Sequence, residues 1–170
     1  MKHTVVALMQ DHPGVLNRVA SMFRRRGYNI DSLAVGGSET PGISRMTLVV
    51  DGEDTIVEQV TKQLYRLIEV LKVSDVSDDP HIARELVLAK IYAPASKRQE
   101  VSSLAEAFGG KIADVGQDSL MVELTTSPDQ IDNFIELVRP FGIREMVRTG
   151  RIAMVRGTPT HAGDAYVKVA

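Results

Sequence analysis

The residues whose types and spacing could bind a ligand are Asp11-His12-Pro13-Gly14-Val15-Leu16. They follow a short apolar run, Val5 to Met9, and precede a stretch of helical periodicity, so Gly14 is expected where a helix begins. Backbone N–H groups at a helix N-terminus lack partners within the helix, and the helix dipole favours an anion there. Glycine allows close approach to the main chain, and Asp11 supplies a neighbouring negative charge. An anion site beside a carboxylate suits a zwitterion, so we predict binding of an α-amino acid.

The same residues also have a purely structural interpretation. Asp is a good N-cap, because its side chain accepts hydrogen bonds from the first helical amides. Pro13 would be tolerated in the first helical turn, and Gly14 would then only mark the turn. The spacing alone leaves both interpretations open.

Catalytic and metal-binding patterns are missing from the sequence. The four histidines are His3, His12, His81 and His161. None of them pairs with another at a metal-ligand spacing, and a chain without cysteine has neither a disulfide nor a thiolate nucleophile. Gly36-Gly37 lacks the lysine and the spacing of a phosphate-binding loop, and no G-x-S-x-G motif occurs. We therefore predict no catalytic residue and no metal ligand in this chain.

Composition and charge narrow the class of protein. The chain has 170 residues, 44% of them hydrophobic, with 20 basic and 22 acidic side chains and a net charge of -2. Such a balance of charge does not favour binding to a nucleic-acid backbone or to an anionic membrane surface. The basic run Arg24–Arg26 is expected to lie at a helix C-terminus, where positive charge complements the helix dipole. The N-terminus lacks a signal-peptide pattern, and no apolar run approaches the roughly 20 residues that span a bilayer. We expect a cytoplasmic, soluble protein.

The chain repeats one order of elements, strand–helix–strand–strand–helix–strand, in its two halves. In the first half, strands are expected at 5–9, 28–35, 46–50 and 70–76, with apolar helix faces at 16–23 and 57–68. In the second half, strands are expected at 86–92, 111–115, 120–124 and 143–147, with helix faces at 101–108 and 131–138.

This order predicts an α+β fold of two tandem ferredoxin-like βαββαβ domains. We place the first domain at 1–76, a linker at 77–83, the second domain at 84–156 and a poorly ordered tail at 157–170. Helices should cover one face of each sheet and leave the other face bare, which predicts association with a second copy or a partner protein.

Several segments, in this order, resemble the ACT family of amino-acid-binding regulatory domains, and specifically the small subunits of acetolactate synthase (acetohydroxyacid synthase). They are Asp11–Val19, Arg25–Leu33, Ser44–Thr47, Lys62–Leu64, Val70–Val76 and His81–Ile91. The resemblance extends to about residue 156 and leaves only the tail uncovered.

The resemblance implies a homodimer whose first domains, ACT domains, pair edge to edge, with valine or another branched-chain amino acid bound at the interface. The turn from Asp11 to Leu16 of one chain would face Asn29 and Ile30 of the other. The implied effector-binding residues are Asp11, His12, Pro13, Gly14, Val15, Leu16, Asn29, Ile30, Val35 and Gly36. The family commonly has Asn where this chain has Asp11, and position 36 is variable in the family.

The resemblance also implies a non-catalytic regulatory subunit in branched-chain amino acid biosynthesis. It would activate the catalytic large subunit of acetolactate synthase and confer feedback inhibition by valine. Thiamine diphosphate, magnesium and FAD would belong to that catalytic partner, and this chain would bind no cofactor. The alternative is a stand-alone regulator with paired ACT domains that responds to an amino acid. It is disfavoured because Lys97-Arg98-Gln99-Glu100 stands where the second half would repeat the Pro-Gly-Val-Leu helix entry.

Overall fold

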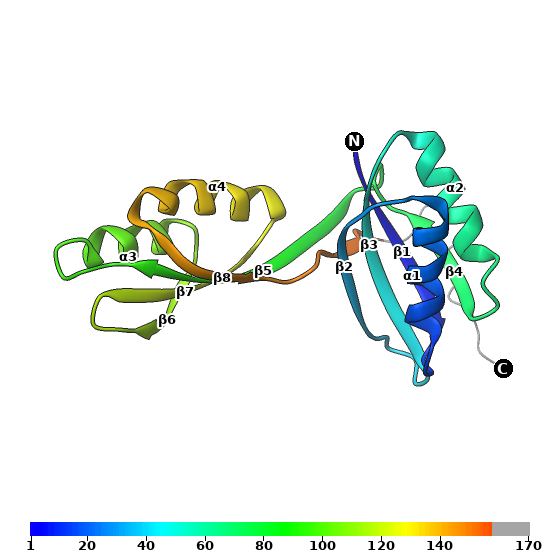
Figure 1. Ribbon diagram of the computed structural model, residues 1–170, viewed down its shortest axis with the longest axis horizontal. Helices are drawn as coiled ribbons and strands as arrows, with labels where there is room; N and C mark the ends of the chain where they lie inside the picture. Colours follow the sequence, from blue (N-terminus) through cyan, green and yellow to red (C-terminus); the bar gives the residue numbers. More distant parts are fainter. Residues whose placement is uncertain (158–170) are drawn as a thin grey trace. The chain divides into compact units, whose positions relative to one another are not determined.

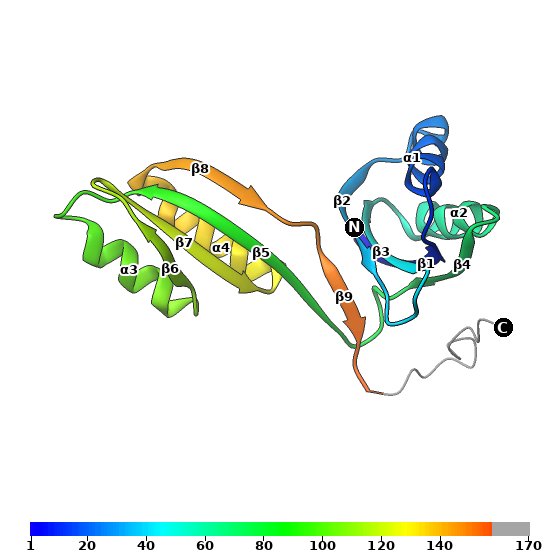
Figure 2. The same cartoon turned by 90° about the horizontal axis from the view of Figure 1, so that it is seen from below.

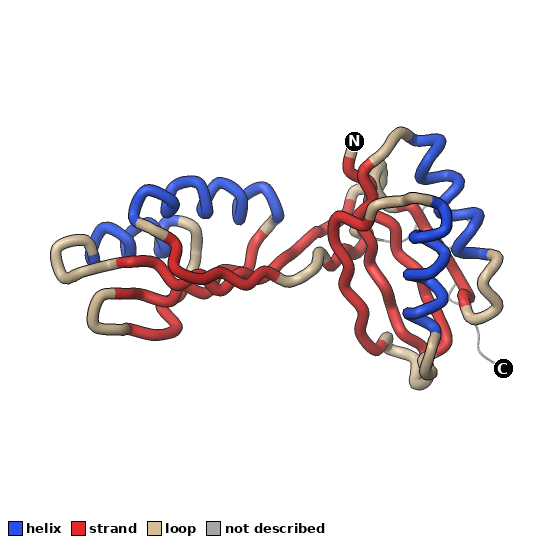
Figure 3. Tube along the Cα trace, in the orientation of Figure 1, coloured by secondary structure: helices blue, strands red, loops and turns tan. Residues whose placement is uncertain are grey.

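The structure is a computed structural model that describes residues 1–157. The chain forms two compact units. Of the described residues, the first unit comprises Met1–Ile82 and Gly150–Gly157, and the second comprises Ala83–Thr149. Each unit has an antiparallel sheet with two helices (Figure 1), and strands and helices alternate along the chain as the sequence predicts (Figure 3).

The two units share one topology. The first contains β1 (Lys2–Gln10), α1 (Val15–Arg26), β2 (Ile30–Gly37), β3 (Ile43–Asp51), α2 (Asp54–Tyr65) and β4 (Val70–Asp75), with strand order β2-β3-β1-β4. The second contains β5 (His81–Tyr92), α3 (Arg98–Ala107), β6 (Lys111–Val115), β7 (Ser119–Thr126), α4 (Pro128–Val138), the 3-10 turn η1 (Arg139–Phe141) and β8 (Ile143–Arg148), with order β6-β7-β5-β8. The last strand, β9 (Ile152–Val155), pairs with β5. The predicted fold class, two tandem ferredoxin-like domains, is confirmed.

Helix α1 shows why these residues form these elements. Val15, Val19, Met22 and Phe23 recur at helical spacing, and all four are buried in the first core. Arg24–Arg26 occupy the last turn, where positive charge complements the helix dipole, as predicted.

The expectation that each sheet leaves one face bare is wrong for the first unit. Figure 2 shows β9 on the face of the β2-β3-β1-β4 sheet opposite helices α1 and α2. Val6, Val76 and Ala153 form a small buried cluster there, with Val155 packed against it. The chain therefore covers this face with a segment that lies almost 80 residues further along the sequence than β4.

The compact units differ from the predicted domain bounds in where residues 150–156 pack. The second domain was predicted at 84–156, whereas the second compact unit comprises Ala83–Thr149, and residues 150–156 pack with the first unit. The expected linker 77–83 is shorter, since β5 already begins at His81. Gly36 and Gly37, which follow the strand expected at 28–35, belong to β2 because they pair with Arg45 and Ser44. The poorly ordered tail was predicted at 157–170, and residues 158–170 lie outside the described residues.

None of the helices within residues 1–157 is long and apolar enough to cross a membrane.

Candidate effector site

The start of α1 shows that Asp11 is not the N-cap residue of this helix. Gly14 is the N-cap residue, with φ 94° and ψ -15° in the left-handed region, and no side chain caps the helix. Because this glycine turns the chain into the helix, Asp11 lies too early in the sequence to act as the cap, and Pro13 precedes the first turn. A Cβ built on Gly14 meets nothing within 4 Å. The first amides of α1 are therefore approachable and have no side-chain partner.

The turn before α1 is held by two other loops. The amide of Asp11 donates to the carbonyl of Gly42 at 2.8 Å, and the amide of Gln10 donates to the carbonyl of Glu69 at 2.9 Å. The left-handed Gly42 lies in the β2–β3 connection, and Glu69 immediately precedes β4. The turn is thus anchored on both sides of β1, which presents the start of α1 at one end of the sheet.

An ion pair that the sequence did not reveal fixes α1 one turn further on. Arg18 contacts the Glu69 carboxylate at 2.5 Å, and the Glu69 side chain is only 4% exposed. Its other carboxylate oxygen, Oε2, is buried and has no hydrogen-bond partner among the described residues. About 50 positions separate the two residues, so no local pattern could have indicated this contact. It stabilises the orientation of the helix that carries Gly14.

The side chains of the turn differ in exposure. Asp11, His12 and Pro13 are exposed, and Leu16 is 46% exposed, so all four can meet a ligand from solvent. Val15 is buried in the first core, so its side chain packs inside the protein, and its amide donates to the carbonyl of His12 at 3.5 Å.

The remaining predicted residues lie on or next to β2, an edge strand of the sheet. Gly36 pairs with Arg45, which pairs with Leu8 near the end of β1. Val35 and Gly36 therefore share the end of the sheet that carries the Asp11–Leu16 turn, and both are exposed.

Asn29 and Ile30 lie at the opposite end of the sheet. Ile30 pairs with Val50, which pairs with His3 at the start of β1. At ~3.3 Å per residue, the Ile30 and Gly36 positions of one strand are roughly 20 Å apart. One chain therefore has Val35 and Gly36 at the same end of the sheet as the turn, and Asn29 and Ile30 at the other end.

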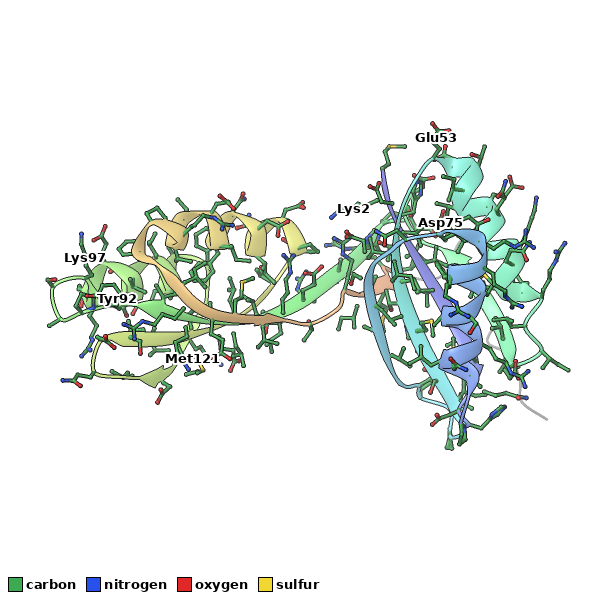
Figure 4. The ribbon with its side chains drawn as sticks, in the orientation of Figure 1. Lys2, Glu53, Asp75, Tyr92, Lys97 and Met121 are labelled. Atoms are coloured by element: carbon green, nitrogen blue, oxygen red, sulfur yellow. The ribbon has the colours of Figure 1, made fainter. Side chains whose placement is uncertain are left out.

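A hollow of about 500 Å³ elsewhere in the first unit involves none of the predicted residues. It is lined by His3, Asp54, Glu58, Thr61, Lys62, Tyr65, Asp75 and Asp78. The buried His3 lies 3.5 Å from Asp54 and 3.7 Å from Asp75, which Figure 4 labels. A hydrogen bond from Lys62 lowers the pKa of Glu58, so that carboxylate is already paired. No group of three or more His, Cys, Asp or Glu among residues 1–157 is arranged to hold a metal ion. We do not assign this hollow to the effector.

Two family models match the two halves of the chain. Residues 6–72 match an "AHAS small subunit-like ACT domain", and residues 84–157 match the "Small subunit of acetolactate synthase". The first unit thus places the protein in the class of ACT-domain proteins. More specifically, the chain belongs to the family of acetolactate synthase small subunits.

Individual relatives agree with this assignment over nearly the whole chain. The "Probable acetolactate synthase small subunit" of Archaeoglobus fulgidus is 50% identical over 157 residues, covering 92% of this chain and 98% of that protein. The "Acetolactate synthase small subunit" of Aquifex aeolicus is 49% identical over 156 residues, covering 91% and 81%. The crystal structure of the acetolactate synthase small subunit from Thermotoga maritima matches with a TM-score of 0.85 at 39% identity, covering 94% of this chain and 99% of that one.

Proposed function

We propose that this protein is the regulatory subunit of an acetolactate synthase in branched-chain amino acid biosynthesis. It binds the catalytic large subunit, raises its activity and confers feedback inhibition by valine. The observation that carries the proposal is the uncapped start of α1 at Gly14, in a chain of the small-subunit family. Thiamine diphosphate, magnesium and FAD belong to the catalytic subunit in this proposal.

The amides at the start of α1 would hold the carboxylate of the amino acid. Unpaired N–H groups and the positive end of the helix dipole both favour an anion there. The open space around Gly14 allows the carboxylate to reach the main chain. The exposed carboxylate of Asp11, three residues before Gly14, would attract the ammonium group of the amino acid. The exposed side chains of Leu16 and Val35 offer apolar surface to the isopropyl group of valine. Discrimination among valine, leucine and isoleucine should be weak, because one methylene is worth only about 1–3 kcal/mol in an apolar pocket.

A two-fold dimer across the β2 edges would complete the site. In an antiparallel pair related by a two-fold axis, each end of one strand lies beside the opposite end of its copy. Pairing about the middle of β2 would therefore bring Asn29 and Ile30 of one copy beside Val35 and Gly36 of the other. The separation of these residues within a single chain supports this arrangement. The Asn29 side chain would then be available to the effector's ammonium group.

Inhibition then follows from a shift between two states of the complex. An effector can shift that equilibrium only if it binds the less active state more tightly, and such couplings are typically worth about 1–3 kcal/mol. A site formed by residues of two chains provides this difference in affinity, because a change in how the two chains pair also changes the shape of the site.

Reconstitution with the catalytic large subunit tests the proposed function. We expect the chain to co-purify with that subunit, to raise its rate of acetolactate formation, and to make the rate sensitive to valine. The catalytic subunit alone provides the baseline for both effects. A complex that forms but shows neither activation nor valine sensitivity would contradict the proposal.

A further inference from the structure

The segment Gly150–Arg156, called the return segment below, makes specific contacts with the ACT-type unit. The amide of Arg151 donates to Oγ of Ser32 on β2 at 2.7 Å, and the Arg45 guanidinium donates to the carbonyl of Ala153 at 2.9 Å. The amide of Arg156 donates to the carbonyl of Pro80 at 2.7 Å. Ala153 is 5% exposed and packs with Val6 and Val76. The return segment is thus bonded at both ends, and the side chain of Ala153 in its middle is buried.

Gly150 lies against the backbone of β2 with no room for a side chain. A Cβ built at this position would overlap the carbonyl oxygen of Leu33 and crowd the amide nitrogen of Ala34. Both are backbone atoms of β2, so they cannot move aside as the end of a flexible side chain could. Only glycine fits here without displacing either the return segment or β2.

The residue before Gly150 is fixed to the second unit. The amide of Thr149 donates to the carbonyl of Leu86, and the Thr149 hydroxyl accepts from the amide of Leu86, both at 2.9 Å. Leu86 lies on β5 in the second unit. One peptide bond therefore joins a residue held by β5 to a residue packed on β2.

We propose that the return segment transmits effector occupancy from β2 to the second unit. This inference rests on the proposed function, since β2 carries Val35 and Gly36 and begins beside Asn29. A ligand that shifts the middle of β2 must move Gly150, because the two backbones are in contact. Movement of Gly150 then pulls on Thr149 and on its hydrogen bonds to Leu86. The segment is a positioning element, and it makes no contact with the effector itself.

The first test compares Gly150→Ala with Gly157→Ala in the reconstituted complex. Gly157→Ala adds the same methyl group just past the return segment, where a Cβ meets nothing within 4 Å; its φ of 68° strains alanine, so any effect of backbone strain alone would appear in this control. We expect Gly150→Ala to bind valine by calorimetry within about threefold of the unsubstituted chain, while inhibition at saturating valine is largely lost; couplings of this kind are worth about 5- to 150-fold. Gly157→Ala should remain fully inhibited. Full inhibition of Gly150→Ala, or loss of its valine binding, would overturn the proposal.

The second test uses the unsubstituted chain, so it holds even if Gly150→Ala fails to fold. We expect saturating valine to change amide hydrogen exchange at Arg151 and within β9 by at least about fivefold, because their hydrogen bonds report local opening. Unchanged exchange in this segment, with valine bound by calorimetry, would overturn the return segment's role. Absence of any calorimetric heat would instead contradict the proposed function itself.

Discussion

Replacing Gly14 by aspartate is expected to abolish valine inhibition while leaving activation of the catalytic subunit intact. The φ of 94° is strained for any residue with a Cβ, and the new carboxylate would stand where the effector carboxylate is proposed to bind. Loss of one charge-assisted hydrogen bond is worth about 2 kcal/mol, so valine affinity should fall at least ~30-fold. Calorimetry measures the affinity, and the acetolactate assay measures inhibition and activation.

Gly109→Asp is the matched control for this substitution. Gly109 also has a positive φ, 74°, and its Cβ would enter open space, but it lies in the second unit. It therefore carries a similar backbone strain and the same added charge in the unit that does not contain the turn. Full valine sensitivity in Gly14→Asp, or equal loss in Gly109→Asp, would refute the site assignment.

Truncating the largest buried side chain of each core should destabilise both units but weaken valine binding only when the first core is altered. Phe134 is fully buried in the second unit beside Phe108, with ring centroids 5.6 Å apart. Phe23 is 2% exposed in the first unit, on the helix that begins at Gly14. Each Phe→Ala change should lower the free energy of unfolding by about 3–5 kcal/mol, because it deletes a buried ring and leaves a cavity.

The two variants should differ in effector binding. We expect Phe134→Ala to keep valine affinity below its unfolding midpoint, since its core is separate from the first one. Phe23→Ala should weaken valine binding, because α1 loses the contact that seats it on the sheet. Denaturant titration gives the stability and calorimetry the affinity. Equal losses of affinity in the two variants would show that the cores do not act as separate units.

Much of the fold was predictable because its signals are local. The apolar periodicity of α1 and the alternation along β5 each specify an element within a dozen residues, and the repeat of their order indicates two similar units. The position of Gly14 at a helix start was likewise predictable, since glycine before an apolar helical face is a local pattern.

What local patterns could not reveal are contacts between distant parts of the chain. The second domain was expected to include residues 150–156, and β9 does pair with β5, but nothing in Ile152–Val155 shows that this short strand also packs on the first sheet. Burial of Ala153 against Val6 depends on a chain reversal that spans the whole second unit. The Asp11 cap was wrong for a local reason, since the left-handed φ of Gly14 moved the helix start beyond it.

The most direct measurement of the central claim, a site shared by two chains, is valine stoichiometry in a mixed dimer. One chain carries Gly14→Asp and the other carries Asn29→His, with different affinity tags so that the mixed species can be isolated. Each substitution alone should eliminate both sites of its own homodimer. The mixed dimer places both substitutions in one site and leaves the second site unaltered, so we predict one bound valine per mixed dimer by calorimetry. No binding by the mixed dimer would mean that Gly14 and Asn29 serve a site within one chain, and would contradict the account.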